Sequence, residues 1–131
     1  MTLARTEGAV AAAASCHYSL SGLGIDLEKH GRQFTGLGSV TLSGAERARA
    51  AHDGDCVADL QVWVRKEAIL KAAGTGLATD PRTLTLDGTT VVEGPPGPWW
   101  VRDLTLADGL YGTVAAHGTL DASLDVADVT C

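Results

Sequence analysis

Four side chains whose types could together hold a metal ion and a phosphate occur at two places in the chain. Asp26 and Glu28 are separated by one residue, whereas Glu67 and Lys71 are separated by three. Mg²⁺ takes a few carboxylate oxygens, keeps waters and bridges to substrate phosphates, and a nearby lysine neutralises charge that builds on a phosphate in the transition state. These residues therefore predict a magnesium–phosphate site. Their spacing alone also allows a plainer interpretation, in which the Glu–Lys pair is a solvated surface ion pair and the two strand carboxylates mark a wet face.

Each pair needs an element that points its side chains in one direction. Residues 22–28 are predicted as a strand in which apolar residues alternate with small or acidic ones, so that Asp26 and Glu28 face the same side. Residues 56–73 are predicted as a helix, with Asp55 as its N-cap and Gly74 just past its end. Side chains one turn apart on that helix, such as Glu67 and Lys71, share a face.

The remaining sequence predicts an α+β domain. A strand is expected over 7–16, a glycine-rich loop over 29–42, and a short helix over 45–51 that is opened by the capping-box pattern of Ser43 and Glu46. Strand patterns follow at 83–86, 89–92, 99–106, 110–117 and 119–129, with hairpin turns at Asp87-Gly88 and at 107–109. We therefore expect residues 1–131 to form one domain, an antiparallel sheet with helices on one side.

Composition excludes several classes of protein. The 131 residues carry a net charge of −6, without the basic footprint of a nucleic-acid binder. No apolar run approaches the length of a membrane span, and we expect no secretory signal because Glu7 interrupts the only candidate run, Met1–Ser15.

The cysteines indicate the compartment and argue against zinc. An odd count of three cysteines without a CxxC pair predicts no disulfide framework and a reducing cytoplasm. The only hints of a zinc site are His17 beside Cys16 and His52 four residues before Cys56, which fall short of the closed four-ligand patterns of such sites.

Two motifs resemble the signatures of the 4′-phosphopantetheinyl transferases. The segment GIDLE at 24–28 is similar to their G-[IV]-D-x-E motif, and WVRKEAILK at 63–71 is similar to their W-x-x-K-E-A-x-x-K motif. The segment LSGAE at 42–46 resembles the helix start that lies between these motifs. The resemblance extends over nearly the whole chain, which is similar to the carboxy-terminal half of the surfactin-synthetase type and has the length of the holo-acyl-carrier-protein synthases.

The resemblance implies a fold of this superfamily and a reaction. Such enzymes move the phosphopantetheine arm of coenzyme A onto a serine of an acyl or peptidyl carrier protein, with Mg²⁺ as cofactor. By match to the motifs, Asp26, Glu28 and Glu67 would hold Mg²⁺ against the coenzyme A pyrophosphate. Glu67 would also help to deprotonate the serine, and Lys71 would contact the pyrophosphate and stabilise the leaving group, with Lys66 nearby.

The chain also departs from the family pattern. Ala4, Arg5 and Thr6 stand where the two-domain members carry a Ser-His-Ser/Thr motif whose histidine helps to bind a coenzyme A phosphate. Arg5 and Thr6 are therefore expected to take part in that binding, since arginine binds phosphate bidentately. The first half of the two-domain enzymes has no counterpart here, so we expect a homo-oligomer, dimer or trimer, with coenzyme A bound across a subunit boundary.

Two hypotheses follow from these observations. The first is a magnesium-dependent transferase, which the presence of all four candidate residues favours. The second is a non-catalytic, half-length module that binds coenzyme A or regulates and needs a partner subunit, which the replaced Ser-His motif favours. The carrier protein and its pathway are not identified by the sequence.

Overall fold

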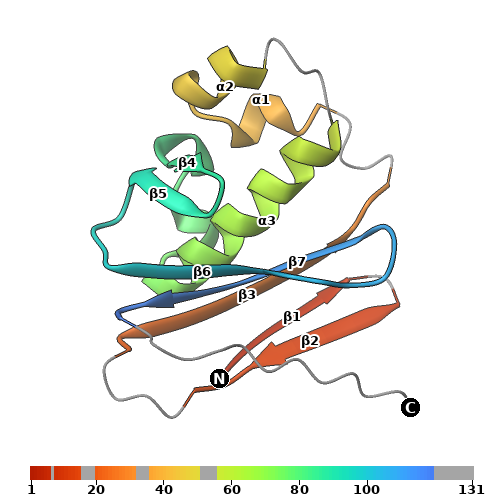
Figure 1. Cartoon of the computed structure of the whole chain (residues 1–131), viewed down its shortest axis with the longest axis vertical. Helices are drawn as coiled ribbons and strands as arrows, with labels where there is room; N and C mark the ends of the chain where they lie inside the picture. Colours follow the sequence, from red (N-terminus) through yellow and green to blue (C-terminus); the bar gives the residue numbers. More distant parts are fainter. Residues whose placement is uncertain (7, 16–19, 32–35, 51–55, 120–131) are drawn as a thin grey trace.

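The computed structural model describes residues 1–6, 8–15, 20–31, 36–50 and 56–119, and it combines antiparallel sheets with helices (Figure 1). The strands are β1 (Thr2–Thr6), β2 (Ala9–Ala13), β3 (Gly22–Lys29), β4 (Thr85–Asp87), β5 (Thr90–Glu93), β6 (Trp99–Leu104) and β7 (Leu110–His117). The helices are α1 (Gly38–Thr41), α2 (Gly44–Ala50) and α3 (Cys56–Ala73), with 3₁₀ turns η2 (Gly76–Ala78) and η3 (Pro81–Thr83). The α+β class predicted from the sequence is confirmed.

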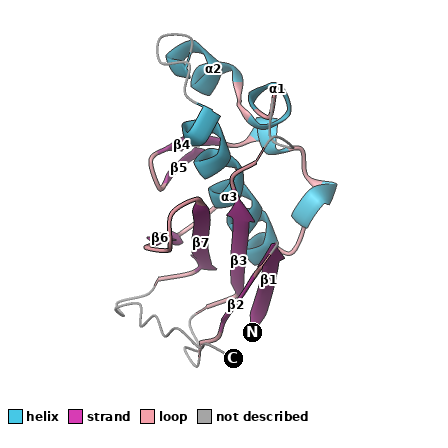
Figure 2. Ribbon diagram, turned by 90° about the vertical axis from the view of Figure 1, so that its right-hand side faces the viewer, coloured by secondary structure: helices cyan, strands magenta, loops and turns pink. Residues whose placement is uncertain are grey.

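A three-stranded antiparallel sheet in the order β3-β7-β6 is covered on both faces. Helix α3 lies over one face, and the β1–β2 hairpin lies against the other (Figures 1 and 2). The core under α3 joins Ala68, Ile69, Leu70, Ala72, Leu84, Leu86, Val101 and Ala115. The core under the hairpin joins Ala4, Ile25, Leu27 and Val114. Alternation along β3 thus sends its large apolar residues toward the hairpin and leaves the other face to α3.

Two glycines of β3 let α3 come very close to the sheet. A Cβ atom built on Gly22 would stand 1.8 Å from the carbonyl oxygen of Ala72, and one built on Gly24 would stand 2.1 Å from that of Ala68. No side chain fits in either place, so the helix backbone rests directly on the strand. Because side chains alternate, Asp26 and Glu28 share the α3-facing side with these glycines.

Helix α3 matches its predicted bounds and ends as expected at Gly74. Gly74 has a φ of 82°, its N–H donates to the carbonyl of Lys71, and the N–H of Thr75 donates to that of Leu70. This pair of hydrogen bonds is the Schellman arrangement, which satisfies the last carbonyls of a helix.

The amino-terminal prediction was wrong in one respect. In place of one strand over 7–16, the structure has the two strands β1 and β2, paired antiparallel with Thr6 opposite Ala9. Gly8 adopts a φ of 77° between them, a conformation that glycine reaches without strain and that turns the chain.

Other bounds shift by a few residues. The turn between β4 and β5 lies at Gly88-Thr89, because Asp87 pairs with Thr90 as the last residue of β4. Strand β6 ends at Leu104, two residues earlier than predicted, and the predicted loop over 29–42 contains the short helix α1.

Some predictions fall outside the described residues. These are the N-cap Asp55, residues 120–129 of the last predicted strand, Cys16 with His17, and His52. No helix in the described part of the chain is long and apolar enough to cross a lipid bilayer.

Candidate active site

Helix α3 and strand β3 bring the predicted residues to one edge of the sheet. The Nζ atom of Lys71 donates to the carbonyl oxygen of Ile25 at 2.8 Å and to Oδ1 of Asp26 at 3.3 Å. The side chain of Asp26 is 10 % exposed and that of Lys71 is 32 % exposed. Lys71 thus pairs with a strand carboxylate and is not a freely solvated helix residue.

The three carboxylates interact with one another. Burial raises the pKa of Asp26, an effect that the charge of Lys71 partly offsets. Burial and the charge of Asp26 raise the pKa of Glu67, again against Lys71. Burial, then the charges of Asp26 and Glu67, raise the pKa of Glu28 from 4.5 to about 7. A cluster of two buried carboxylates and one partly buried carboxylate, with one lysine, therefore lies where α3 crosses β3.

Two oxygens of this cluster lack any hydrogen-bond partner among the residues that the structure describes. Oδ2 of Asp26 and Oε1 of Glu67 are both buried and unsatisfied. A buried, unpaired carboxylate oxygen is costly unless a donor or a cation compensates it. Two such oxygens fit Mg²⁺, which is usually bound by one or two carboxylates together with waters and substrate phosphates.

The cluster is not a preassembled metal cage. Among the described residues, no three His, Cys, Asp or Glu side chains are gathered closely enough to hold a metal ion by themselves. The described residues thus supply an electrostatic cluster with two open oxygens, and metal binding by Asp26, Glu28 and Glu67 stays a prediction.

A comparison with protein families identifies the group to which the chain is related. The family model of the 4′-phosphopantetheinyl transferase superfamily matches residues 22–112, more than half of the chain. The chain belongs to this superfamily. No curated protein matches it. The matched segment begins at the first residue of β3 and includes all four clustered side chains.

Lys66, the other lysine of the transferase motif, lies elsewhere than predicted. Its side chain is fully buried, and its Nζ atom donates to the carbonyls of Thr41, Pro81 and Leu84 at 2.8, 2.8 and 2.7 Å and to Oε1 of Glu46 at 2.5 Å. An ammonium group has only three hydrogens to donate. The structure therefore pairs Lys66 with Glu46 and not with Asp26, Glu28 or Glu67. We no longer expect Lys66 to contact coenzyme A.

Glu46 is a buried residue whose wider role the sequence did not reveal. The capping box is confirmed, since Ser43 N–H donates to Glu46 Oε1 at 2.8 Å and Glu46 N–H donates to Ser43 Oγ at 3.3 Å. Beyond that local role, Glu46 Oε2 accepts the N–H of Leu86 at 2.8 Å. Although burial raises the pKa of Glu46, hydrogen bonds from Lys66 and from backbone N–H groups bring it below its ordinary value. The capping pattern signalled the helix start, and nothing in the spacing signalled the pairing with Lys66.

Arg5 and Thr6 are separated by the alternation of β1. The hydroxyl oxygens of Thr2 and Thr6 accept the N–H groups of Ile25 and Lys29, each at 3.3 Å, and so fix β1 along β3. Thr6 thereby lies beside the residue that follows Glu28. Arg5 is exposed on the other side of β1, so its binding to coenzyme A stays a prediction.

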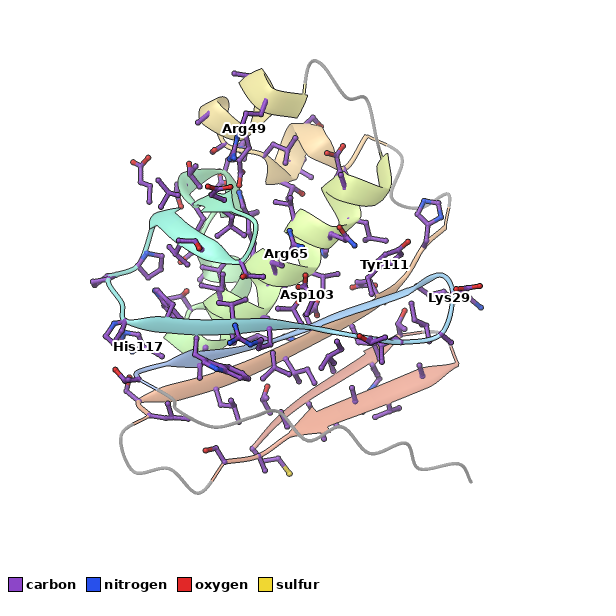
Figure 3. The ribbon with its side chains drawn as sticks, viewed as in Figure 1. Lys29, Arg49, Arg65, Asp103, Tyr111 and His117 are labelled. Atoms are coloured by element: carbon purple, nitrogen blue, oxygen red, sulfur yellow. The ribbon has the colours of Figure 1, made fainter. Side chains whose placement is uncertain are left out.

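A second polar cluster lies at the β6 edge of the sheet. Arg65 forms a bidentate pair with Asp103, with its Nη2 atom 2.7 Å from Oδ2, and the hydroxyl of Thr113 donates to Oδ1 of Asp103 at 2.9 Å (Figure 3). Thr113 stands opposite Asp26 in the β3–β7 register. Its hydroxyl hydrogen is used by Asp103, which is consistent with the unsatisfied state of Asp26.

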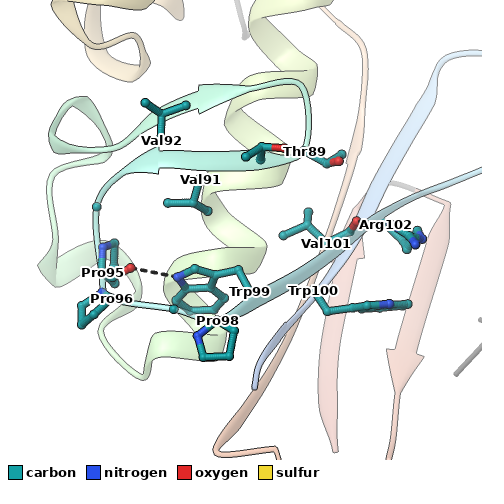
Figure 4. A pocket seen from close by; sticks show the side chains of 13 residues that line it. Thr89, Val91, Val92, Pro95, Pro96, Pro98, Trp99, Trp100, Val101 and Arg102 are labelled. Carbon is teal, nitrogen blue, oxygen red and sulfur yellow. Dashed lines mark hydrogen bonds between the residues drawn. The ribbon is translucent and has the colours of Figure 1, made fainter. Parts of the chain in front are cut away.

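A groove in the described part of the chain lies away from the carboxylates. It has a volume of about 660 Å³ and is lined by residues 89–92 and 94–102, from β5 and the turn before it to the first half of β6 (Figure 4). Trp99 packs against the core under α3 and its Nε1 atom donates to the carbonyl of Pro95 at 2.8 Å. Trp100 packs against the core under the hairpin. The groove contains none of the clustered acids, so the chemistry of the α3–β3 edge, and not cavity size, marks the candidate active site.

Proposed function

We propose that this member of the superfamily transfers the 4′-phosphopantetheine group from coenzyme A to a serine hydroxyl of an acyl or peptidyl carrier protein, with Mg²⁺ as cofactor. The observation that carries the proposal is the meeting of Asp26, Glu28, Glu67 and Lys71 at one sheet edge, with two buried carboxylate oxygens left unsatisfied. Phosphoryl transfer needs mainly positioning and charge neutralisation, which such a cluster supplies.

The residues have distinct roles in this proposal. Asp26 and Glu67 offer their open oxygens to Mg²⁺, and Glu28 adds a third carboxylate once it is ionised. The metal, when bound, supplies Lewis-acid polarisation of the pyrophosphate. Lys71 keeps a hydrogen free beyond its bonds to Ile25 and Asp26, and that hydrogen is directed to the pyrophosphate.

The transfer step exchanges one phosphorus–oxygen bond for another. The serine oxygen of the carrier attacks the phosphorus that bears the pantetheine arm, and the bond from that phosphorus to the bridging oxygen breaks. Adenosine 3′,5′-bisphosphate leaves with the bridging electrons, its new charge stabilised by Lys71. The serine proton passes to Glu67, directly or through a water.

The proposal includes a second subunit. The clustered side chains lie at the β3 edge of the sheet, which has no further strand paired to it in the described part of the chain. We propose that a homo-oligomer, dimer or trimer, completes the coenzyme A site, with Arg5 and Thr6 contributing from the end of β1.

A transfer assay tests the proposal. The chain is incubated with coenzyme A, Mg²⁺ and a panel of apo carrier proteins, and each carrier is weighed by intact mass spectrometry. A gain of one phosphopantetheine group, lost when Mg²⁺ is chelated, supports the proposal. No gain on any carrier, with an oligomer shown in solution, counts against it.

The alternative is a coenzyme A-binding module without turnover. The exposed position of Arg5, away from the carboxylates, is the observation that favours it. A monomer that coenzyme A stabilises in the presence of Mg²⁺, with no transfer, supports this alternative.

A further inference from the structure

We infer that the buried Glu46–Lys66 pair is a positioning device for the active site, and that Lys66 acts on the reaction through Glu67 and Lys71 instead of contacting coenzyme A. This inference rests on the proposed function for its activity readouts, but its metal-binding readout does not need turnover. It assigns a role to the motif lysine that the geometry separates from the carboxylates.

The first step is the number of segments that meet at Lys66. Its Nζ atom contacts the last residue of α1, the first residue of η3, the residue before β4, and Glu46 of α2, which are Thr41, Pro81, Leu84 and Glu46. Glu46 adds a contact to Leu86 in β4. One fully buried side chain of α3 thus anchors three separate segments, which are α1, α2 and the η3 turn with its C-cap residue.

The second step is the direction of these contacts around α3. Successive residues of an α-helix are rotated by about 100°, so Lys66 and Glu67 leave the helix in different directions. Ala68 and Ala72 rest on β3, Lys71 reaches over its edge to Asp26, and Lys66 anchors the helix to the segments outside the sheet. A rotation of α3 about its axis would therefore break the Lys66 contacts and move Glu67 and Lys71 together.

The third step is the smooth surface beneath the helix. Gly22 and Gly24 permit close approach because they have no side chain. For the same reason, they offer no side-chain ridge that could pack into a groove of the helix. Packing of Ile69 and Leu70 in the core already opposes a rotation of α3 over β3. The Lys66 contacts add to this constraint, since three of them are to backbone carbonyls whose positions are set by other elements.

A set of single variants separates positioning from direct binding. In Glu46→Gln the cap acceptor and the side-chain shape are kept and the charge beside Lys66 is removed, while the amide nitrogen in place of Oε2 no longer accepts the N–H of Leu86. In Lys66→Met the anchor itself is removed. We expect both variants to lower Mg²⁺ affinity by up to about 10–100-fold, the loss found when a residue that directly contacts a metal ligand is removed. We also expect kcat to fall with little change in KM for coenzyme A.

Two controls separate positioning from general loss of stability. Arg65→Met breaks a neighbouring ion pair of α3 that points to β6, and Val114→Ala creates a cavity in the core under the hairpin, on the other face of the sheet from α3. Both should lower the melting temperature and leave Mg²⁺ affinity unchanged. If Lys66→Met does not fold, Glu46→Gln carries the test.

The outcomes are distinct. Reduced Mg²⁺ affinity in both pair variants, measured by titration calorimetry and by the Mg²⁺-induced rise in melting temperature, supports the inference. Unchanged Mg²⁺ affinity in a folded Glu46→Gln variant overturns it, and so does a rise in KM for coenzyme A in Lys66→Met alone with kcat unaltered. Absence of transfer by the unmodified chain contradicts the proposed function, while the metal titrations still decide the inference.

Discussion

At the scale of single residues, the account depends on carboxylate oxygens that the folded chain leaves without partners. Asp26 has one oxygen on Lys71 and one without a donor, and Glu67 has an unsatisfied buried oxygen as well. A protein retains such groups where a ligand or a cation compensates them. The two lysines of the motif differ in the number of acceptors around their Nζ atoms. Lys71 has two among the described residues, which leaves one hydrogen for a ligand, whereas Lys66 has four acceptors for its three hydrogens.

The first prediction concerns Glu67. The substitution Glu67→Gln removes a negative charge from a buried cluster of like charges, so the melting temperature without metal should rise. The Mg²⁺-induced rise in melting temperature should disappear, and transfer should fall at least about 100-fold, as when one group that stabilises transition-state charge is lost. Differential scanning fluorimetry and the transfer assay measure these effects.

Asp108→Asn is the matched control for Glu67→Gln. Asp108 is exposed in the turn before β7, so its substitution should change neither the melting temperature, nor its rise with Mg²⁺, nor the transfer rate. If Glu67→Gln kept the full Mg²⁺-induced rise in melting temperature, Glu67 would not be a ligand of the metal.

The second prediction concerns pH and Glu28. The pKa of Glu28 is raised in the fold from 4.5 to about 7, so the folded state holds this proton more tightly than the unfolded state does. The corresponding stability is present below about pH 4.5 and is lost as the pH rises through about 7. Without metal, the melting temperature should therefore decrease as the pH rises from about 4.5 to about 7. The decrease should be smaller in Glu28→Gln, which has no carboxyl group to titrate at this position.

Protons and Mg²⁺ should also compete at Glu28. The Mg²⁺-induced rise in melting temperature should be larger above pH 7 than below pH 6, because the metal binds the ionised carboxylate. An Mg²⁺ effect independent of pH from 5.5 to 8 would contradict the assignment of Glu28 as a ligand.

At the scale of elements, the site depends on the order of residues on one face of β3. Gly22 and Gly24 lie where α3 contacts the strand, and Asp26 and Glu28 follow them on the same face. The third prediction tests this contact. In Gly24→Ala the new methyl group would stand 2.1 Å from the carbonyl of Ala68, so α3 must shift. We expect a loss of about 1–3 kcal/mol of unfolding free energy, typical of an overpacked contact, together with weaker Mg²⁺ binding. Urea unfolding and metal titration check both.

Gly44→Ala is the control for this contact. A Cβ atom at Gly44 meets nothing within 4 Å and lies in the first turn of α2, so it should be neutral or stabilise by up to about 1 kcal/mol. Equal destabilisation by both substitutions would show that the close approach at Gly24 is not the cause.

The elements also show what the sequence could and could not predict. Helix α3 and strands β3 and β7 were predicted nearly to the residue, because their patterns and their end signals are local. Strand β2 lies within the strand predicted over 7–16, but β1 and the turn before β2 were missed, because the five residues of β1 are too few for a clear periodic signal and only Gly8 marks the turn. Within the site, period two predicted that Asp26 and Glu28 share a face, and helix spacing predicted that Glu67 and Lys71 share one. The pairing of Lys66 with Glu46 spans 20 residues and depends on tertiary packing, which no local spacing encodes.

At the scale of the whole molecule, the clustered residues lie at an edge of the sheet and not in the groove between β5 and β6. An edge site leaves one side of a bound nucleotide uncovered unless another surface closes over it. The fourth prediction follows from this. Light scattering should show a dimer or a trimer, and the specific transfer rate should fall on dilution below the dissociation constant of the oligomer, because the coenzyme A site is then incomplete. A monomer with an undiminished rate at all concentrations would contradict the shared site.

The central claim is that Asp26, Glu28 and Glu67 hold one divalent ion beside the pyrophosphate of coenzyme A. Its most direct test replaces Mg²⁺ with paramagnetic Mn²⁺ and follows the ³¹P resonances of bound coenzyme A. The account predicts strong broadening of the pyrophosphate resonances by the unmodified chain and its loss in the double variant Asp26→Asn/Glu67→Gln, with the fold of the variant confirmed by circular dichroism. Equal broadening by both proteins would contradict it.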